Sequence, residues 1–167
     1  MKFSSGLIDL QVEIIRAKAG ESVVISGAAG ATGSMVIQIA KHIVSCSKVI
    51  GLAGSDEKCR WVESLGADVC INYKDADWKD QLTKATPGFV DMYFDNVGGE
   101  QLDFMLTRMK TYGRIAACGA ISVYNKQNFE GIKNWTQIIL QRLEVSCIAE
   151  TRLFHYPPRT LYRQVMM

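Results

Sequence analysis

The sequence predicts an α/β fold in which a doubly wound parallel sheet of about six strands carries helices on both faces. Short apolar, β-branched runs alternate along the chain with longer segments of helical period. The short runs do not alternate between apolar and polar residues, which indicates strands covered on both faces. A turn of small residues, "SGAAGATGS", joins the first run to the first helical segment. Together these observations predict strand, helix and strand repeated with right-handed crossovers.

Six runs are expected to form the strands because each is short, apolar and rich in residues that favour extended backbone. In chain order they are SVVIS at 22–26, KVIGLA at 48–53, ADVCI at 67–71, VDMYFD at 90–95, RIAACG at 114–119 and EVSCIA at 144–149. Each is separated from the next by a segment long enough to hold a helix, which a parallel connection requires.

Five segments between these runs are predicted to be helices, at 33–44, 56–66, 75–85, 99–109 and 134–143. In the second of them, Cys59 and Val62 are followed by Leu65 or Gly66, which is the spacing of one buried helical face. We expect this face to pack on the sheet.

The two ends of the chain differ in character from the middle. Residues 1–18 form a divergent N-terminal segment, in which Leu7, Leu10 and Ile14 are spaced as in a short helix that Gly20 could close. Residues 150–167 hold two of the three prolines and three arginines without a clear period. This last segment is expected to be an irregular tail.

Composition places the chain among ordinary globular proteins. Its 167 residues are 48% hydrophobic and 22% charged, with a formal net charge of +2, which excludes a disordered or nucleic-acid-coating chain. The five cysteines are scattered and form no C-x-x-C pair, so a reducing, cytoplasmic location is expected. Asp9 and Glu13 interrupt the segment that a secretion signal would need. No apolar stretch is long enough for a membrane anchor.

The turn at 26–34 matches the G-x-G-x-x-G pattern of Rossmann-type dinucleotide-binding folds, with Ala28 in the first glycine position. Gly30 would let the backbone approach phosphate oxygens, and Gly33 would let the helix pack closely on the strand. Gly27 could adopt positive φ in the turn. By itself this match also fits an ordinary strand-to-helix turn, so the next strand has to decide between the two interpretations.

The end of the second strand favours NADPH over NADH. NAD-binding folds place an acidic residue there to hold the ribose hydroxyls, whereas a 2′-phosphate needs small polar and cationic groups. This strand ends in "GLAGSDEK", where Ser55 lies at the strand end and Lys58 follows one helical turn later. Asp56 is explained as an acid in the first turn of a helix that Ser55 caps. Lys58 could also be part of a solvated helix face.

Four motifs together resemble one family. "GAAGATGSMVIQIAK", "SLGADVCINYK", "DMYFDNVGGE" and "GRIAACGAISVYN" stand in the order and spacing of the cofactor-binding domain of medium-chain dehydrogenase/reductases. The chain resembles their zinc-independent alkenal double-bond reductase branch, which includes the prostaglandin reductases. Quinone oxidoreductases share the first three motifs, and the stretch "CGAISVYN" points to the alkenal reductases. The resemblance covers roughly residues 19–143.

The resemblance implies an NADP(H) site built from several segments. It assigns one group of residues to the pyrophosphate, a second to the 2′-phosphate, Tyr73 to the adenosine end, Asn96 to the ribose on the nicotinamide side, and a last group to the nicotinamide half. The pyrophosphate group is Gly30, Ala31, Thr32 and Gly33, the 2′-phosphate pair is Ser55 and Lys58, and the nicotinamide group is Cys118, Gly119, Ala120, Ile121, Ser122 and Tyr124.

Several of these residues also have an ordinary structural interpretation. Tyr73 could merely end a strand, and Asn96 could be a turn residue before two glycines. Cys118 is more easily read as a small buried hydrophobe than as a nucleophile. The joint occurrence of the residues, rather than any one of them, therefore carries the assignment.

The resemblance also implies the chemistry, which is hydride transfer from C4 of NADPH to the β-carbon of an α,β-unsaturated aldehyde or ketone. Tyr124 is the local candidate for a catalytic hydrogen-bond donor to the developing oxyanion, and it could equally line the nicotinamide pocket. No metal is expected, because His42 and His155 have no Cys or carboxylate partners at ligand spacing. The expected partner is a small enal or enone rather than a nucleic acid or a membrane, and a homodimer stays open.

The resemblance assigns residues 19–149 to an NADP(H)-binding domain. Longer family members also have a GroES-like substrate domain, for which we expect no counterpart in this sequence. Our hypothesis from the sequence is a natural or artefactual truncation. Two alternatives to an alkenal reductase stay open, namely a quinone oxidoreductase and a cofactor-binding module without catalysis.

Overall fold

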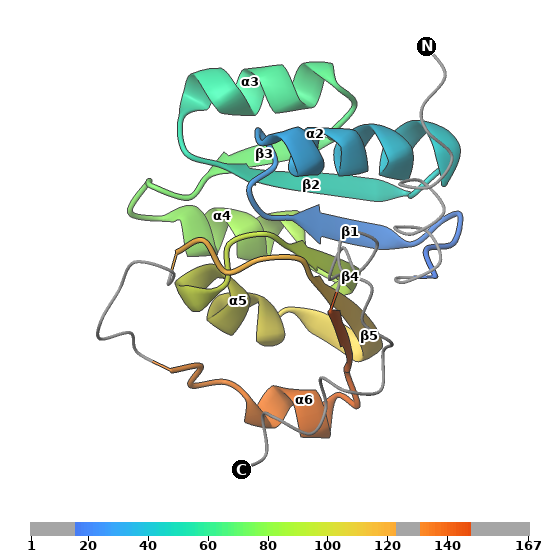
Figure 1. Ribbon diagram of the computed structural model, residues 1–167, viewed down its shortest axis with the longest axis vertical. Coiled ribbons are helices and arrows are strands. Elements are labelled where there is room, and N and C mark those ends of the chain that lie inside the picture. The colour runs from blue at the N-terminus through green and yellow to red at the C-terminus, as the bar shows by residue number, and fades with distance from the viewer. Residues whose placement is uncertain (1–15, 123–130, 148–167) are drawn as a thin grey trace, which may run out of the picture.

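The computed structural model describes residues 16–122 and 131–147 (Figure 1). Strands and helices alternate through most of this range. In chain order the elements are β1 (Ser22–Ile25), α2 (Ala31–Gln38), the π-helical turn η1 (Ile39–Ile43), β2 (Lys48–Ala53), α3 (Asp56–Ser64), β3 (Val69–Asn72), α4 (Trp78–Ala85), β4 (Val90–Asp95), α5 (Gly99–Leu106), β5 (Met109–Ala117), α6 (Thr136–Leu140) and β6 (Glu144–Cys147).

The described strands form one six-stranded sheet in the order β3-β2-β1-β4-β5-β6. Every neighbouring pair in it is parallel. This is the order of a doubly wound Rossmann-type fold, so the predicted fold class is confirmed. The chain runs outward from β1 in one direction and then returns to place β4 on the other side of β1. The switch point between β1 and β4 is where such folds bind their ligands.

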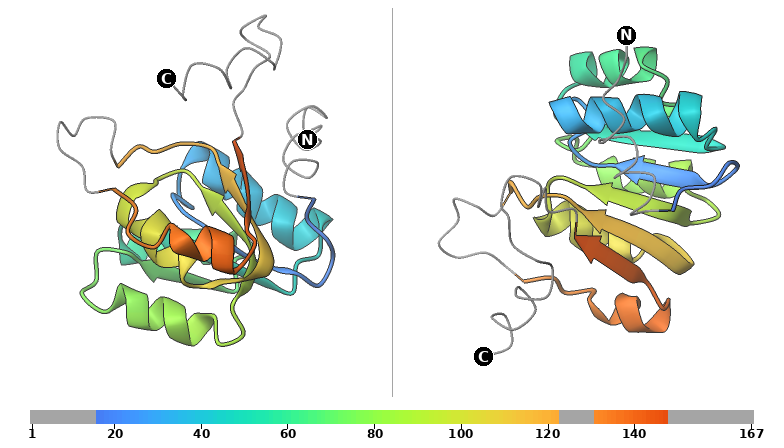
Figure 2. Two further views of the ribbon diagram at one scale, coloured as in Figure 1. Left: turned by 90° about the horizontal axis from the view of Figure 1, so that it is seen from below. Right: turned by 45° about the vertical axis from the view of Figure 1, so that its right-hand side comes forward.

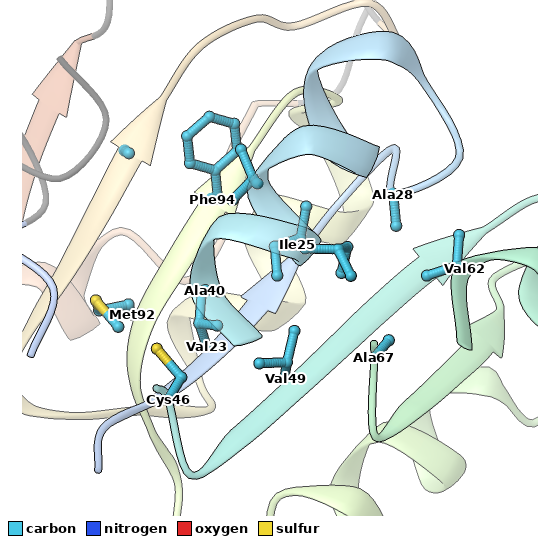
Figure 3. Packing of buried hydrophobic residues seen from close by; sticks show 13 residues of the cluster. Val23, Ile25, Ala28, Ala40, Cys46, Val49, Val62, Ala67, Met92 and Phe94 are labelled. Atoms are coloured by element: carbon cyan, nitrogen blue, oxygen red, sulfur yellow. The ribbon is translucent and has the colours of Figure 1, made fainter. Parts of the chain in front are cut away.

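Two apolar clusters cover the two faces of the sheet, because successive side chains on a strand point to opposite sides. Val23 and Ile25 of β1 belong to the first cluster, together with side chains of α2, η1 and α3 (Figure 3). Val24 belongs to the second cluster, with Trp78 of α4 and Met105 of α5. The helices therefore lie on both faces, as the sequence predicts.

The fifth strand is longer than the sequence indicates. It begins at Met109, which pairs with Val90, and its register against β4 shifts between Val90 and Met92. Tyr112 within it has a φ of 63°. Hydrophobic spacing extended the predicted helix to 109, but α5 ends at Leu106. Leu106 and Met109 are both buried. Their spacing of three residues is typical of a continuous helix, but it also occurs here, where a helix ends and a strand begins soon afterwards.

The helix after the glycine turn also differs from its prediction. The single segment expected at 33–44 begins earlier, as α2, and finishes as the π-helical turn η1. Ser45 then has a φ of 62°, and its carbonyl accepts a hydrogen bond from Gly20 N–H at 3.0 Å. A non-glycine residue therefore holds the left-handed conformation that ends many helices.

The N-terminal helix expected through Leu7, Leu10 and Ile14 lies outside the described residues, and so does the tail at 150–167. Gly20, expected to close that helix, has a φ of 84°. Within 16–122 and 131–147, no helix has both the length and the apolar character needed to cross a membrane.

Candidate functional site

A cavity of about 380 Å³ opens at the carboxyl ends of β1, β2 and β4, next to the switch point. It takes its lining from the glycine turn, from the ends of β2 and β3, and from the loops after β4 and β5. The lining residues are Gly27, Ala29, Gly30, Ala31, Thr32, Gly33, Ala53, Gly54, Lys58, Tyr73, Lys74, Asn96, Val97 and Ile121. Segments far apart in the sequence therefore meet in one site, as the fold requires.

The glycine turn is built so tightly that side chains are excluded from it. A Cβ atom on Gly33 would lie 2.8 Å from the Cα of Ala28 and would overlap the carbonyl oxygen of Gly27. Gly27 itself has a φ of +58°. Both glycines are thus required for the reasons the sequence suggested, namely close packing of the helix and positive φ in the turn. Ala28, between them in the chain, is buried and does not line the cavity.

The N-terminus of α2 presents backbone donors to the cavity. Its first intrahelical bond runs from Ser34 N–H to the Gly30 carbonyl, so the N–H groups of Ala31, Thr32 and Gly33 have no partner within the helix. Gly30 caps the helix without a side chain, and the first turn has no acidic residue. The unpaired N–H groups can donate hydrogen bonds to phosphate oxygens, and the positive end of the helix favours a negative charge. Together they suit a pyrophosphate.

Unlike α2, helix α3 has a side-chain cap and acidic residues in its first turn. Ser55 Oγ accepts the Lys58 N–H at 3.3 Å, and Asp56 and Glu57 occupy the first turn. The side chains of Ser55, Asp56 and Glu57 therefore already stabilise the positive end of α3. Ser55 acts as the helix cap that the sequence suggested, and it is not among the residues that line the cavity.

Tyr73 and two lysines form the end of the cavity near β2 and β3. A Cβ atom on Gly54 would lie 3.0 Å from the Tyr73 hydroxyl, so the phenol ring lies against the bare backbone at the end of β2. Lys58 comes from α3 and Lys74 follows Tyr73 directly. Both are exposed, and they are the charged residues among the lining set. This end of the cavity is cationic.

A buried hydrogen-bond network holds Asn96 at the switch point. Its backbone N–H donates to Ser26 Oγ at 2.8 Å, and its side-chain amide donates to the Ser26 carbonyl at 2.8 Å. Ser26 Oγ in turn donates to Asp95 Oδ1 at 2.9 Å. Asp95 is 1% exposed and Oδ1 also accepts bonds from the Tyr93 hydroxyl and the backbone of Val97 and Gly98. Asn96 is therefore fixed before any ligand arrives.

Tyr93 belongs to this network as a hydrogen-bond donor. Burial, together with the neighbouring Asp95 carboxylate, raises its pKa well above the usual range. The phenol consequently stays protonated and donates to Asp95 across the pH range in which the protein would work. Polar residues that end an apolar strand are the sequence signal for this network, which sequence reasoning did not use.

The loop after β5 lies beside the loop after β4. Cys118 N–H donates to the Asp95 carbonyl at 2.7 Å, while the N–H and hydroxyl of Ser122 both donate to the Val97 carbonyl. Ile121 extends from this loop into the cavity with 68% of its surface exposed. Burial raises the pKa of the Cys118 thiol to about 12, so this cysteine is a thiol at neutral pH and not a nucleophile.

A second cavity of about 430 Å³ lies at the opposite, amino-terminal end of the strands. Most of its charged side chains form ion pairs: Arg114 donates to Glu21 at 2.6 Å, and Lys110 donates to Asp91 at 2.9 Å. These ion pairs join β5 to β4 and to the residue before β1, so the second cavity is a structural feature of the amino-terminal end of the sheet.

Comparisons with known proteins agree with this geometry. The family described as zinc-binding dehydrogenase matches residues 31–162. Prostaglandin reductase 1 of Bos taurus is 52% identical over 122 residues, and an NADP(+)-dependent 2-alkenal reductase of Nicotiana tabacum is 41% identical over 151 residues. The chain belongs to the medium-chain dehydrogenase/reductase superfamily, in its alkenal and prostaglandin reductase branch.

The match covers only part of these reductases. It takes in 72% of this chain but 35% of the bovine protein, and 89% of this chain but 43% of the tobacco protein. Among solved structures, CurA of Vibrio vulnificus in complex with NADPH has a TM-score of 0.79 and 36% identity, covering 87% of this chain and 45% of that one. The chain therefore spans less than half the length of each of these three proteins.

The structure brings many of the expected cofactor residues into one cavity. Those that line it are Gly30, Ala31, Thr32, Gly33, Lys58, Tyr73, Asn96 and Ile121. Those that lie close in sequence to lining residues, without lining it themselves, are Ser55, Cys118, Gly119, Ala120 and Ser122. Tyr124 falls outside the described residues. Lys74 was missed, although a second lysine next to Tyr73 was visible in the sequence.

The family that matches residues 31–162 is described as zinc-binding dehydrogenase. Among the residues that the structure describes, no group of three or more His, Cys, Asp or Glu side chains is placed to hold a metal ion. His42 is exposed at the end of the first helix, with Nε2 3.2 Å from the Leu65 carbonyl, and His155 lies outside the described range. Zinc independence stays a prediction.

Proposed function

We propose that this chain is the NADP(H)-binding part of a reductase that delivers hydride to the carbon–carbon double bond of an α,β-unsaturated aldehyde or ketone. The chain binds NADP(H), and the observation that supports this most directly is the cavity at the switch point. There the unpaired N–H groups of Ala31, Thr32 and Gly33 face a cationic end formed by Lys58 and Lys74. Membership of a branch with NADP-dependent relatives agrees with it.

The proposed placement of the cofactor follows from these charges. The pyrophosphate would lie on the N-terminus of α2, and the adenosine 2′-phosphate would lie between Lys58 and Lys74. Tyr73 would cover the adenosine end, and the Ser55 hydroxyl, which accepts a bond in capping α3, would still have its hydrogen to donate to phosphate. Asn96, already oriented by Ser26, would contact the ribose on the nicotinamide side.

Bound NADPH supplies the hydride, and the residues of this chain orient it and shape the site. The rigid network under Asn96 and the exposed Ile121 would hold the nicotinamide half in place. Tyr124 is proposed as the donor to the developing oxyanion, on the family resemblance alone. The substrate class is likewise a proposal, supported by the printed names of the relatives in the branch.

Binding and turnover are tested separately. Fluorescence titration with NADPH and NADH measures both affinities, and equal values would refute the proposed 2′-phosphate site. Steady-state assays with NADPH and a short enal, with a quinone as the alternative acceptor, then measure turnover. Quinone reduction faster than enal reduction would move the chain to the quinone oxidoreductases, and NADPH binding without turnover would leave a cofactor-binding module.

We also propose that the chain forms a homodimer in the cytoplasm. β6 is the last strand of the described sheet and pairs with β5 on one side (Figure 2, right). Val145 on β6 and Ile139 and Leu140 on α6 are strongly exposed apolar residues, which favours a protein contact there. The five cysteines are free thiols, as expected in a reducing compartment. Light scattering that gives the monomer mass at micromolar concentration would refute the dimer.

A further inference from the structure

The side-chain amide of Asn72, at the end of β3, bonds to Asp56 of α3 and to two residues of the turn that follows β3. Its Nδ2 donates to Asp56 Oδ1 and to Asp75 Oδ1, both at 3.0 Å. Its Oδ1 accepts the Lys74 N–H at 3.2 Å. The two carboxylates fix which end of the amide carries the nitrogen, because only a donor satisfies them. Aspartate at position 72 would place a third carboxylate there.

Asp56 is the acidic residue that complicates an NADPH site. It follows the strand end by a few residues, close to where NAD-binding folds keep the carboxylate that holds the ribose hydroxyls. Gly54 and Lys58, on either side of it in the chain, both line the cavity, but Asp56 does not. Its carboxylate is bonded to Asn72 instead. A carboxylate turned into the cavity would repel a 2′-phosphate dianion and would neutralise Lys58.

The same amide also shapes the second cation of the site. By accepting the Lys74 N–H, Asn72 closes a turn directly after β3, and the Asp75 N–H bonds the Asn72 carbonyl at 3.0 Å. This turn sets the backbone of Lys74 next to Tyr73 at the cavity. One side chain therefore withdraws a negative charge from the adenosine end and fixes the backbone of a positively charged residue there.

We propose that Asn72 is the positioning residue that sets the preference of this chain for NADPH over NADH, by holding the Asp56 carboxylate away from the 2′-phosphate and the Lys74 backbone towards it. The inference rests on the proposed 2′-phosphate site at Lys58 and Lys74. It assigns the selectivity to a residue that does not line the cavity and is two strands away from the glycine turn.

The test is fluorescence titration of the 167-residue chain with NADPH and with NADH. Asn72→Ala is expected to weaken NADPH binding by about 3- to 10-fold, as one released charge near a partly solvated phosphate would, with NADH affinity nearly unchanged. In an Asp56→Asn background the same substitution should have a smaller effect on the ratio of the two affinities, because only the contribution through the Lys74 backbone remains. A purely structural role would weaken both cofactors in parallel in either background, and that result would overturn the proposal.

A matched control is available where the segment before α6 meets α5. Asn134 Nδ2 donates to Asp103 Oδ2 at 2.9 Å, which is the same kind of amide–carboxylate pair, and neither residue lines the cavity. Asn134→Ala should leave the NADPH to NADH ratio at the wild-type value. Asn72→Ser, which keeps a small polar side chain, replaces Asn72→Ala if the alanine variant does not fold.

Lys58→Ala separates failure of this inference from failure of the proposed site. If Lys58→Ala keeps the wild-type preference for NADPH, the 2′-phosphate assignment is wrong. If Lys58→Ala loses the preference but Asn72→Ala keeps it, the site stands and the role of Asn72 is refuted. Raising the salt concentration should shrink the effect of Asn72→Ala, because it is electrostatic in origin.

Discussion

The methyl group of Ala28 packs against the bare backbone of Gly51 on β2. A Cβ atom on Gly51 would lie 3.0 Å from the Ala28 Cβ and 2.8 Å from Val62 Cγ1. Ala28 is 0% exposed, and its N–H donates to the Leu52 carbonyl at 3.0 Å. Figure 3 shows Ala28 and Val62 directed at the same stretch of β2. The alanine in the first glycine position thus fills the space that a glycine on the next strand leaves open.

This contact predicts the effect of Gly51→Ala. The added methyl would overlap Ala28 and Val62 in a packed core, so the free energy of unfolding should fall by about 1–3 kcal/mol. Urea denaturation measures it. The double variant with Ala28→Gly should recover part of the loss, because it removes one of the two overlaps. A Gly51→Ala protein as stable as wild type would contradict the packing described here.

Gly33→Ala is expected to damage both folding and cofactor binding. The new methyl would meet the backbone of Gly27 and Ala28, which cannot move without displacing α2 from β1. NADPH affinity should fall by at least about tenfold, because the N–H groups of α2 would shift from the phosphates. Gly88→Ala is the control, since nothing lies within 4 Å of a Cβ there. Fluorescence titration after a check of folding by circular dichroism decides the outcome.

Lys58 and Lys74 should both contribute to NADPH affinity. A charge-assisted bond to phosphate is worth roughly 1.5–3 kcal/mol, so Lys58→Ala should weaken NADPH binding about 10- to 100-fold. Lys74→Ala should weaken it in the same direction, and neither should change NADH binding much. Lys84→Ala on α4 removes an exposed lysine that does not line the cavity. An equal effect of Lys84→Ala would mean that only overall charge matters.

Ser45→Gly is expected to stabilise the chain. Ser45 holds a φ of 62° at the end of η1, a conformation that costs a side-chain-bearing residue about 1 kcal/mol and glycine almost nothing. After the greater entropy of glycine in the unfolded state is subtracted, a gain of roughly 0.5 kcal/mol remains. Gly20→Ala, at a φ of 84°, should have the opposite sign. Thermal unfolding midpoints compare the two variants.

The lowered pKa of the Asp91 carboxyl predicts how the stability of the fold depends on pH. Burial by itself would raise the pKa of Asp91, but hydrogen bonds from Ser22 and Lys110 outweigh it and hold that pKa below the usual value. A carboxyl with a lowered pKa in the folded state contributes stability above its unfolded pKa, and this contribution is lost as the pH falls below about 4. Asp91→Asn should therefore cost stability at pH 7 and much less at pH 3.

Urea denaturation at both pH values measures this difference. Asp80→Asn, which removes an exposed carboxylate on α4, is the control. An Asp91→Asn protein that loses the same free energy of unfolding at pH 3 as at pH 7 would show that the ion pair does not carry the pH dependence.

The sequence predicted the features that depend on residues near one another in the chain. The period of apolar residues predicted the alternation of strands and helices, and the small residues at 27–33 predicted the tight turn before α2. The same reasoning misplaced the start of β5, because Leu106 and Met109 satisfy a helical spacing even though Met109 pairs with Val90. The spacing of apolar residues also could not predict the positive φ of Tyr112, which occurs in β5 together with the register shift against β4.

By itself, then, the sequence determined a doubly wound sheet with a tight turn of small residues after its first strand, and it predicted a phosphate site there and a 2′-phosphate site at the end of the second strand. Only the tertiary structure decided that Asp56 bonds to Asn72 instead of lining the cavity, that Lys74 joins Lys58, and that Ala28 fits over Gly51. The physical reason is that a periodic pattern specifies which face of an element is buried, whereas the partner met across that face depends on how distant strands come together.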